Sequence, residues 1–196
     1  MLFNGLDFLI YSSHKTGTQT LKTTLKRRYR VYMIHLLRDL STIWRQCITR
    51  EHVVHALELY KRLYGCPLKI ITVIRDSEDR LLSSFFQTFH DDLIMDYKMD
   101  PAATPVATKT ADELFEMFTT HKNNLPYFRE SLDELNEIDP SLYDLYTLDF
   151  ARIGDLDYIN SVLGTNLSKL VVENVTRDKV YREKFEHVKA RLGKAT

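Results

Sequence analysis

A lysine and a glycine lie in a short loop where a predicted strand meets a predicted helix. The apolar run Phe8–Tyr11 predicts a buried strand, and Leu21 and Leu25, one turn apart, predict a helix. Between them the sequence reads SSHKTGT, with Lys15 and Gly17. Backbone N–H groups at a helix N-terminus favour anions, glycine lets a ligand approach them closely, and lysine adds a mobile positive charge. The stretch therefore predicts a site for a phosphate-like anion.

The spacing within this loop differs from that of the loop that binds nucleotide triphosphates. That motif reads G-x-x-x-x-G-K-[ST], with its lysine after the last glycine. Here Lys15 comes two residues before Gly17, and no earlier glycine lies in the loop. Asp149 follows an apolar strand as a Walker-B acid would, but it has no Walker-A lysine to accompany it. The sequence therefore does not support a Walker-type ATP site.

A second candidate anion site follows another short strand. Lys69–Ile74, KIITVI, is rich in β-branched residues and predicts a strand that is buried on both faces. Arg75 follows this strand directly, and a helix is predicted to begin near Glu78. Ser83 lies about 130° from the apolar stripe of that helix, so the core does not require it. Both candidate anion sites thus lie where a strand leads into a helix.

Together these motifs resemble those of the sulfotransferases that use 3′-phosphoadenosine 5′-phosphosulfate (PAPS). Lys-Thr-Gly-Thr at 15–18 is similar to the family's 5′-phosphosulfate loop, and VIRDSEDRLLSSFF at 73–86 is similar to its 3′-phosphate element. LYTLDF followed by INSVLG resembles the family's late strand and helix, and ENVTRDKVY at 173–181 resembles a motif of capsular polysaccharide synthesis proteins, an offshoot of the superfamily. The resemblance implies a P-loop NTPase-like architecture.

The resemblance also implies a role for each site residue. The loop residues that it places on the 5′-phosphosulfate are Lys15, Thr16, Gly17, Thr18, Gln19 and Thr20. Arg75 and Ser83 would hold the 3′-phosphate, since an arginine can bind two oxygens at once. Lys15 would also neutralise the charge that builds on the leaving phosphate. His35 matches the family's His-Leu dipeptide at the end of the second strand and would take the proton of the acceptor, because the ordinary pKa of histidine, about 6.5, suits a base at neutral pH.

Alternatives to this assignment stay open. His14, beside the loop lysine, is a rival base, and glycan-directed relatives use a glutamate, so a carboxylate elsewhere is a third candidate. Thr20 and Thr147 stand where the cytosolic branch of the family has an adenine-stacking tryptophan and a tyrosine, so the adenine contacts are unassigned.

Three functions follow from these observations. The first is transfer of a sulfuryl group from PAPS to an acceptor hydroxyl, with a carbohydrate as the expected acceptor and no metal required. The second is a kinase of the same broad fold, which would need ATP and magnesium. The third is a nucleotide-binding protein without catalysis. Neither the acceptor nor the oligomeric state can be identified from the sequence.

Composition is typical of a soluble globular protein. The chain has 196 residues, of which 44% are hydrophobic and 28% charged, and we expect a single domain over residues 1–196. The 27 Lys and Arg residues balance 27 Asp and Glu residues, which argues against a nucleic-acid partner but allows a local anion site. No apolar run approaches the roughly 20 residues that cross a bilayer, and the N-terminus has no signal-peptide pattern. With Cys47 and Cys66 interpreted as reduced thiols, we expect a cytoplasmic enzyme without membrane insertion.

Predicted strands alternate with predicted helices along the chain. This order predicts parallel β-α units and a three-layer α/β domain with a central, mainly parallel sheet. Lys15, His35 and Arg75 all fall near the ends of predicted strands, with His35 in the strand Val31–Leu37. Ligands of such sheets bind at the carboxyl ends of the strands, so the three side chains are expected to face one ligand. Asp91–Lys109 lacks periodicity and predicts a long loop, mobile over 91–110.

Overall fold

The computed structural model describes residues 2–13, 16–36, 39–45, 47–124, 132–171 and 180–193. It divides into two compact units. The sheet unit comprises Met1–Arg75 and Glu130–Glu173, and the helical unit comprises Asp76–Arg129 and Asn174–Thr196. Among the described residues, the sheet unit has two hydrophobic cores, one on each face of its sheet, and the helical unit has a third. The expected single domain over residues 1–196 stays a prediction.

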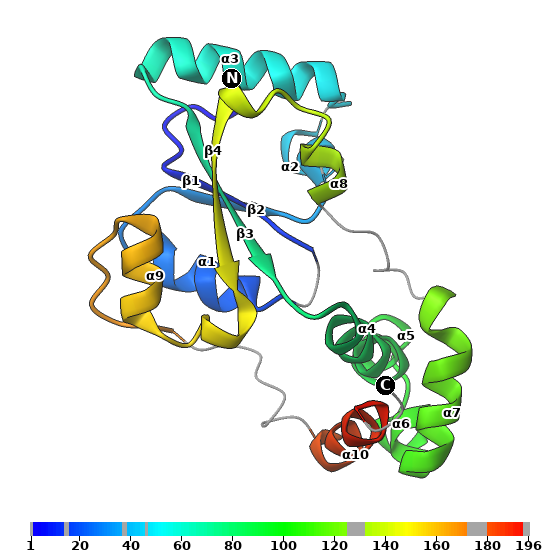
Figure 1. Cartoon of the computed structure of the whole chain (residues 1–196). Helices are drawn as coiled ribbons and strands as arrows, with labels where there is room; N and C mark the ends of the chain where they lie inside the picture. Colours follow the sequence, from blue (N-terminus) through cyan, green and yellow to red (C-terminus); the bar gives the residue numbers. More distant parts are fainter. Residues whose placement is uncertain are drawn as a thin grey trace. The chain divides into compact units, whose positions relative to one another are not determined.

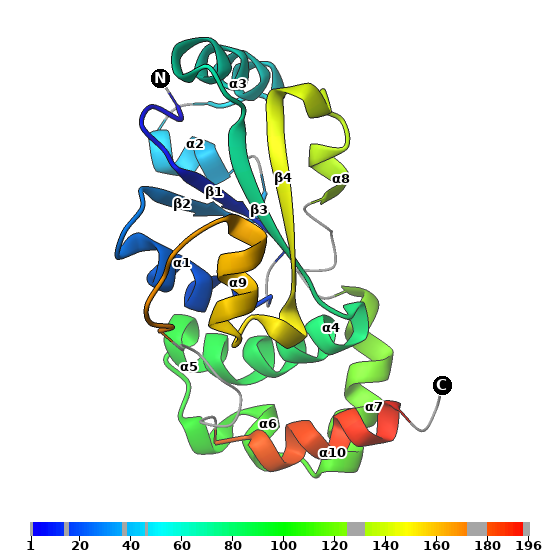
Figure 2. The same cartoon turned by 60° about the vertical axis from the view of Figure 1, so that its left-hand side comes forward.

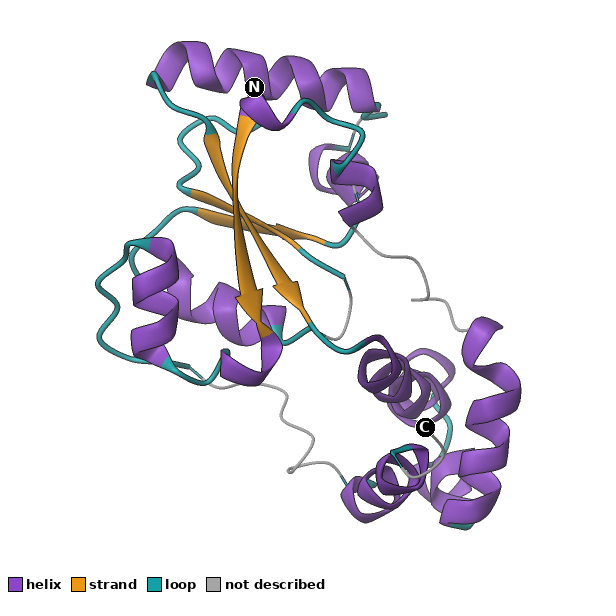
Figure 3. Ribbon diagram, viewed as in Figure 1, coloured by secondary structure: helices purple, strands orange, loops and turns teal. Residues whose placement is uncertain are grey.

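In its described residues, the sheet unit has four parallel strands in the order β2-β1-β3-β4 (Figures 1 and 3). The strands are β1 (Phe8–Tyr11), β2 (Val31–Ile34), β3 (Leu68–Ile74) and β4 (Tyr143–Asp149). The predicted α/β class with a parallel central sheet is confirmed. The second strand is shorter than predicted, ending at Ile34 rather than Leu37. The Asp39 carboxylate accepts the N–H groups of His35 and Leu36 at 2.8 and 2.9 Å, so these groups cannot continue the ladder.

Helices cover both faces of this sheet. One face packs against α2 (Asp39–Trp44), α3 (Arg50–Tyr64) and α8 (Leu132–Leu135), and the other against α1 (Thr18–Lys26) and α9 (Leu156–Leu163). Because side chains alternate along a strand, Leu9 and Tyr11 belong to the first core and Phe8 and Ile10 to the second. All four are almost fully buried, at 0–3% exposure. This is the three-layer arrangement that the alternation of strands and helices predicted. The short helices η4 (Pro140–Leu142) and η5 (Phe150–Arg152) flank β4.

The helical unit, whose helices are drawn in Figure 2, has a core of aromatic and aliphatic side chains. Its elements are α4 (Ser77–Phe86), the π-helix η1 (Gln87–Asp91), α5 (Asp92–Tyr97), η2 (Pro101–Ala103), α6 (Pro105–Thr108), α7 (Ala111–His121), η3 (Lys122–Asn124) and α10 (Arg182–Leu192). Phe85, Phe86 and Phe118 are fully buried there. Among the residues described, no helix is long and apolar enough to cross a bilayer.

The prediction of an irregular loop over Asp91–Lys109 is wrong, because the structure has the helices α5, η2 and α6 in this segment. The two prolines start helices here because a proline at the first helical position needs no N–H partner. Asp100 and Thr104 cap these helices by accepting the N–H groups of Ala102 and Ala107, at 2.9 and 3.2 Å. Val106, with 1% exposure, anchors the segment in the core. The mobility of residues 91–110 stays a prediction.

The helical unit is expected to lose stability above about pH 10 through Tyr181. Burial raises the pKa of this phenol, and the charge of Asp91, which accepts its hydroxyl hydrogen at 3.3 Å, raises it further. Because the folded pKa lies above the unfolded value of about 10, the stabilisation is complete below that pH and is lost as the pH rises toward the folded pKa. Between about pH 9 and pH 11, the midpoint temperature of thermal unfolding should therefore fall more steeply for wild type than for Tyr181→Phe. Tyr97→Phe is the control, because Tyr97 has 75% exposure. Its midpoint temperature should fall as steeply with pH as that of wild type.

Candidate anion-binding site

The order of the strands indicates where on the carboxyl edge of the sheet a ligand is expected to bind. The chain leaves β1 toward β2 on one side, whereas β3 pairs with β1 on the other side. In open parallel sheets, ligands bind beyond the carboxyl ends of the strands where the strand order reverses in this way. Here that position lies at the ends of β1 and β3, where the loop with Gly17 and the residue Arg75 follow.

Two buried hydroxyls lie between the end of β1 and its neighbours: Ser12 contacts strand β3, and Thr16 contacts Ser12. Ser12 Oγ accepts the N–H of Val73 at 3.0 Å and lies 3.1 Å from the carbonyl oxygen of the same residue. Thr16 Oγ1 lies 2.9 Å from Ser12 Oγ and donates to the Ser13 carbonyl oxygen at 2.7 Å. Ser12 is fully buried and Thr16 has 1% exposure. The Thr16 hydroxyl thus connects the start of α1 to Ser12 and Ser13 at the end of β1.

Gly17 and Arg75 meet at the ring of Phe150, the first residue of η5. Gly17 has φ of 72°, the left-handed region that favours glycine, and a Cβ there would lie 3.1 Å from Phe150 Cε2. The guanidinium carbon of Arg75 lies 4.2 Å from the centroid of the same ring. The two predicted anion-binding elements of the sheet unit therefore converge on one aromatic side chain. Phe150 was not among the predicted site residues; its signal in the sequence is an aromatic residue at the end of the predicted strand 143–150.

His35 is held by the backbone of strand β1. Its Nδ1 lies 2.7 Å from the carbonyl oxygen of Ser12. A carbonyl oxygen only accepts, so Nδ1 carries the hydrogen, and in the neutral ring Nε2 is then the nitrogen with the lone pair. A base needs this tautomer, with the acceptor nitrogen held in a defined direction. The structure thus brings the His35 ring to Ser12, the residue directly after the end of β1.

A carboxylate also lies at this end of β1. The hydroxyl of Tyr11, a fully buried residue directly before Ser12, donates to Glu134 Oε2 at 2.5 Å. Glu134 belongs to α8, which follows more than one hundred residues later, and no local pattern in the sequence marks it. Glu134 is therefore one candidate for the carboxylate base that the sequence left open.

The remaining predicted residues occupy different surroundings. Thr18 and Thr20, with 4% and 6% exposure, are buried in the first turn of α1, and Gln19 between them is half-buried. Ser83 lies on α4 in the helical unit, so its pairing with Arg75 stays a prediction. Lys15 and His14 lie outside the described residues, as do residues 173–179 of the ENVTRDKVY phrase.

Asp149, the acid considered for a Walker-type site, has a local structural role. Its carboxylate accepts the N–H of Ala151 at 2.9 Å and caps η5. This cap fixes the turn that begins with Phe150. Within the described ranges, no group of three or more His, Cys, Asp or Glu side chains is placed to hold a metal ion.

Gly17→Ala is expected to destabilise the chain by about 1–2 kcal/mol and to weaken binding of adenosine 3′,5′-bisphosphate about tenfold. The new Cβ would strain the left-handed backbone and crowd the Phe150 ring, which Arg75 contacts. Gly164→Ala is the matched control, because Gly164 has φ of 63° and a Cβ added there would meet nothing within 4 Å. Thermal unfolding should show a similar loss of stability in both variants. Titration calorimetry should show a loss of affinity in Gly17→Ala alone. Equal affinities for the two variants would contradict the prediction.

Comparisons with protein-family models, with curated proteins and with solved structures found no match to this chain.

Proposed function

We propose that this chain transfers a sulfuryl group from PAPS to the hydroxyl of an acceptor, with a carbohydrate as the expected acceptor, on a P-loop-like α/β fold. One observation carries the proposal: the loop around Gly17 and the strand-end residue Arg75, predicted separately as phosphate-binding elements, meet at Phe150. The hydrogen bonds between Ser12 and Val73 support it, because they hold Ser12, the first residue after β1, beside strand β3. A cytoplasmic location belongs to the same proposal.

Each residue has a role in the proposed reaction. PAPS supplies the activated sulfuryl group. The N–H groups at the start of α1 and the Lys15 ammonium would bind the 5′-phosphosulfate, and Lys15 would neutralise the charge that develops on the leaving phosphate. Arg75, together with Ser83, would bind the 3′-phosphate. His35 would take the proton from the acceptor hydroxyl, with its Nδ1–H held by the Ser12 carbonyl.

The test is a transfer assay with purified chain and PAPS against a panel of mono- and oligosaccharides. Release of adenosine 3′,5′-bisphosphate that depends on an acceptor supports the proposal, and Lys15→Ala should lower that release at least about a hundredfold. Transfer from ATP that requires magnesium would instead favour the kinase. Binding of adenosine 3′,5′-bisphosphate with no turnover of any acceptor, and no effect of Lys15→Ala on background hydrolysis, would favour a non-catalytic nucleotide-binding protein.

A further inference from the structure

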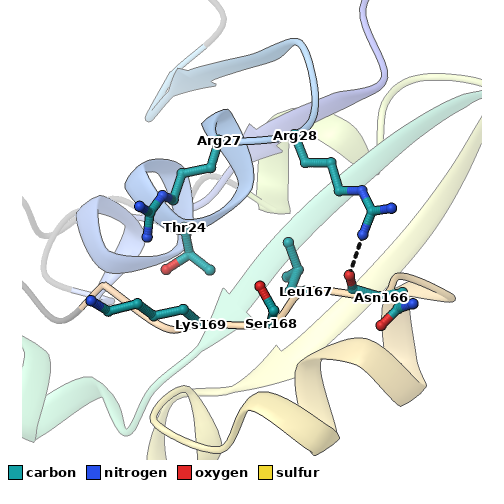
Figure 4. A pocket seen from close by; sticks show the side chains of 7 residues that line it. All are labelled: Thr24, Arg27, Arg28, Asn166, Leu167, Ser168 and Lys169. Atoms are coloured by element: carbon teal, nitrogen blue, oxygen red, sulfur yellow. Dashed lines mark hydrogen bonds between the residues drawn. The ribbon is translucent and has the colours of Figure 1, made fainter.

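A pocket of about 330 Å³ lies beside the C-terminal half of α1 in the sheet unit (Figure 4). One wall comes from α1 and the turn after it, and the other from the segment that follows α9. Two hydrogen bonds join these walls: Arg28 Nη1 donates to the Asn166 carbonyl oxygen at 2.5 Å, and the N–H of Val171 donates to Thr24 Oγ1 at 3.0 Å. The pocket is therefore formed between two segments that the fold fixes to each other.

Positive charge dominates the lining of this pocket. Arg27, Arg28 and Lys169 line it together with the hydroxyls of Thr24 and Ser168, and none of the described acidic residues does. Arg27 and Lys169 make no hydrogen bond or ion pair through their side chains within the described ranges. Figure 4 shows their side chains extending toward the same end of the pocket, with Arg28 and Asn166 at the other. The positive charges of Arg27 and Lys169 thus border one pocket, and no described acidic side chain pairs with either of them.

The C-terminus of α1 alone does not account for this arrangement. A helix C-terminus carries about half a negative charge and attracts cations, which is sufficient reason for basic residues such as Arg27 at that end. Lys169, however, belongs to a separate segment and lies on the opposite wall. Three full positive charges exceed the partial charge of the helix end, so the pocket as a whole attracts an anion.

We propose that this pocket binds a phosphate or sulfate ester of monosaccharide size. A guanidinium can bind two oxygens of such a group, and Lys169 adds a point charge. A volume of about 330 Å³ lies at the lower end of the range for small-molecule pockets, which suits one sugar ring with its ester group. The site is separate from the candidate active site, because the nine residues of α1, about 13 Å in length, lie between Gly17 and the turn at Arg27. The inference does not rest on the proposed sulfuryl transfer.

Titration calorimetry on the full chain tests this inference with glucose 6-phosphate, glucose 6-sulfate, inorganic phosphate and glucose as probes. We expect the esters to bind, glucose not to bind, and the affinity to fall as salt is added. Arg27→Gln and Lys169→Gln should each weaken binding about tenfold or more, and Arg27→Lys should weaken it less, since the charge remains. A preference between the two esters identifies which of them the site takes.

Arg62→Gln, on α3, is the matched control, and Arg75→Ala separates the pocket from the candidate active site. Neither should change the affinity for the esters. Equal thermal midpoints for wild type, Arg27→Gln and Lys169→Gln establish that these exposed positions leave the fold intact. The inference is overturned if glucose binds as tightly as its esters, if no ester binds at millimolar concentration, or if Arg75→Ala abolishes the binding and Arg27→Gln does not.

Discussion

Replacing His35 with asparagine is expected to lower the rate of sulfuryl transfer by about 10²–10⁴-fold while leaving the affinity for adenosine 3′,5′-bisphosphate nearly unchanged. The Nδ1–H of His35 donates to the Ser12 carbonyl oxygen at 2.7 Å, and the amide N–H of asparagine can occupy a similar position. The substitution thus keeps the contact to the end of strand β1 and removes Nε2, the nitrogen that would accept the proton. Loss of rate with unchanged binding separates a catalytic base from a residue that only supports the loop.

Steady-state rates with PAPS and an active acceptor, together with titration calorimetry, measure both quantities. His55→Asn is the matched control and should keep the wild-type rate, because His55 is an exposed histidine of α3 whose Nδ1 lies 3.7 Å from Glu58 Oε2. Glu134→Gln and His14→Asn test the other two candidate bases. A wild-type rate in His35→Asn together with a large loss in Glu134→Gln would assign the base to the carboxylate at the end of β1.

Arg75→Ala is expected to weaken the binding of adenosine 3′,5′-bisphosphate by about tenfold to a hundredfold and to leave the binding of ADP almost unchanged. The proposed contact joins the guanidinium to the 3′-phosphate, which ADP lacks, and hydrogen bonds to charged groups contribute about 1.5–3 kcal/mol. The ring of Phe150 stacks on this guanidinium and keeps it at the end of β3. We therefore expect Phe150→Leu to weaken binding in the same direction but by a smaller factor.

Arg152→Ala provides a control of the same chemistry in the same unit. The Arg152 guanidinium carbon lies 3.9 Å from the centroid of the Tyr158 ring, so the variant also removes an arginine stacked on an aromatic ring. Its affinity for both nucleotides should match wild type. If wild type binds ADP and adenosine 3′,5′-bisphosphate equally well, the assignment of Arg75 to a 3′-phosphate is wrong, and the kinase becomes the better interpretation.

Much of the sheet unit could be predicted because its signals are local. The apolar run Phe8–Tyr11 and the β-branched run before Arg75 are strands, and Gly17 before α1 has the left-handed backbone that glycine permits. Alternation of strands with helices leads to parallel pairing, since each helix returns the chain to the start of the next strand. These patterns extend over a few residues and so can be recognised in the sequence.

The convergence of the site residues depends on contacts between distant segments. Phe150 lies beside both Gly17 and Arg75 only because β4 pairs with β3, and Glu134 reaches Tyr11 only because α8 packs on the same face as α3. The pocket with Arg27 and Lys169 likewise forms where the segment after α9 returns to α1. Residue type and periodicity determine which face of an element is apolar, but pairing order follows from how those faces bury one another across the whole chain. That burial is a property of the folded unit, so the position of these side chains is visible only in three dimensions.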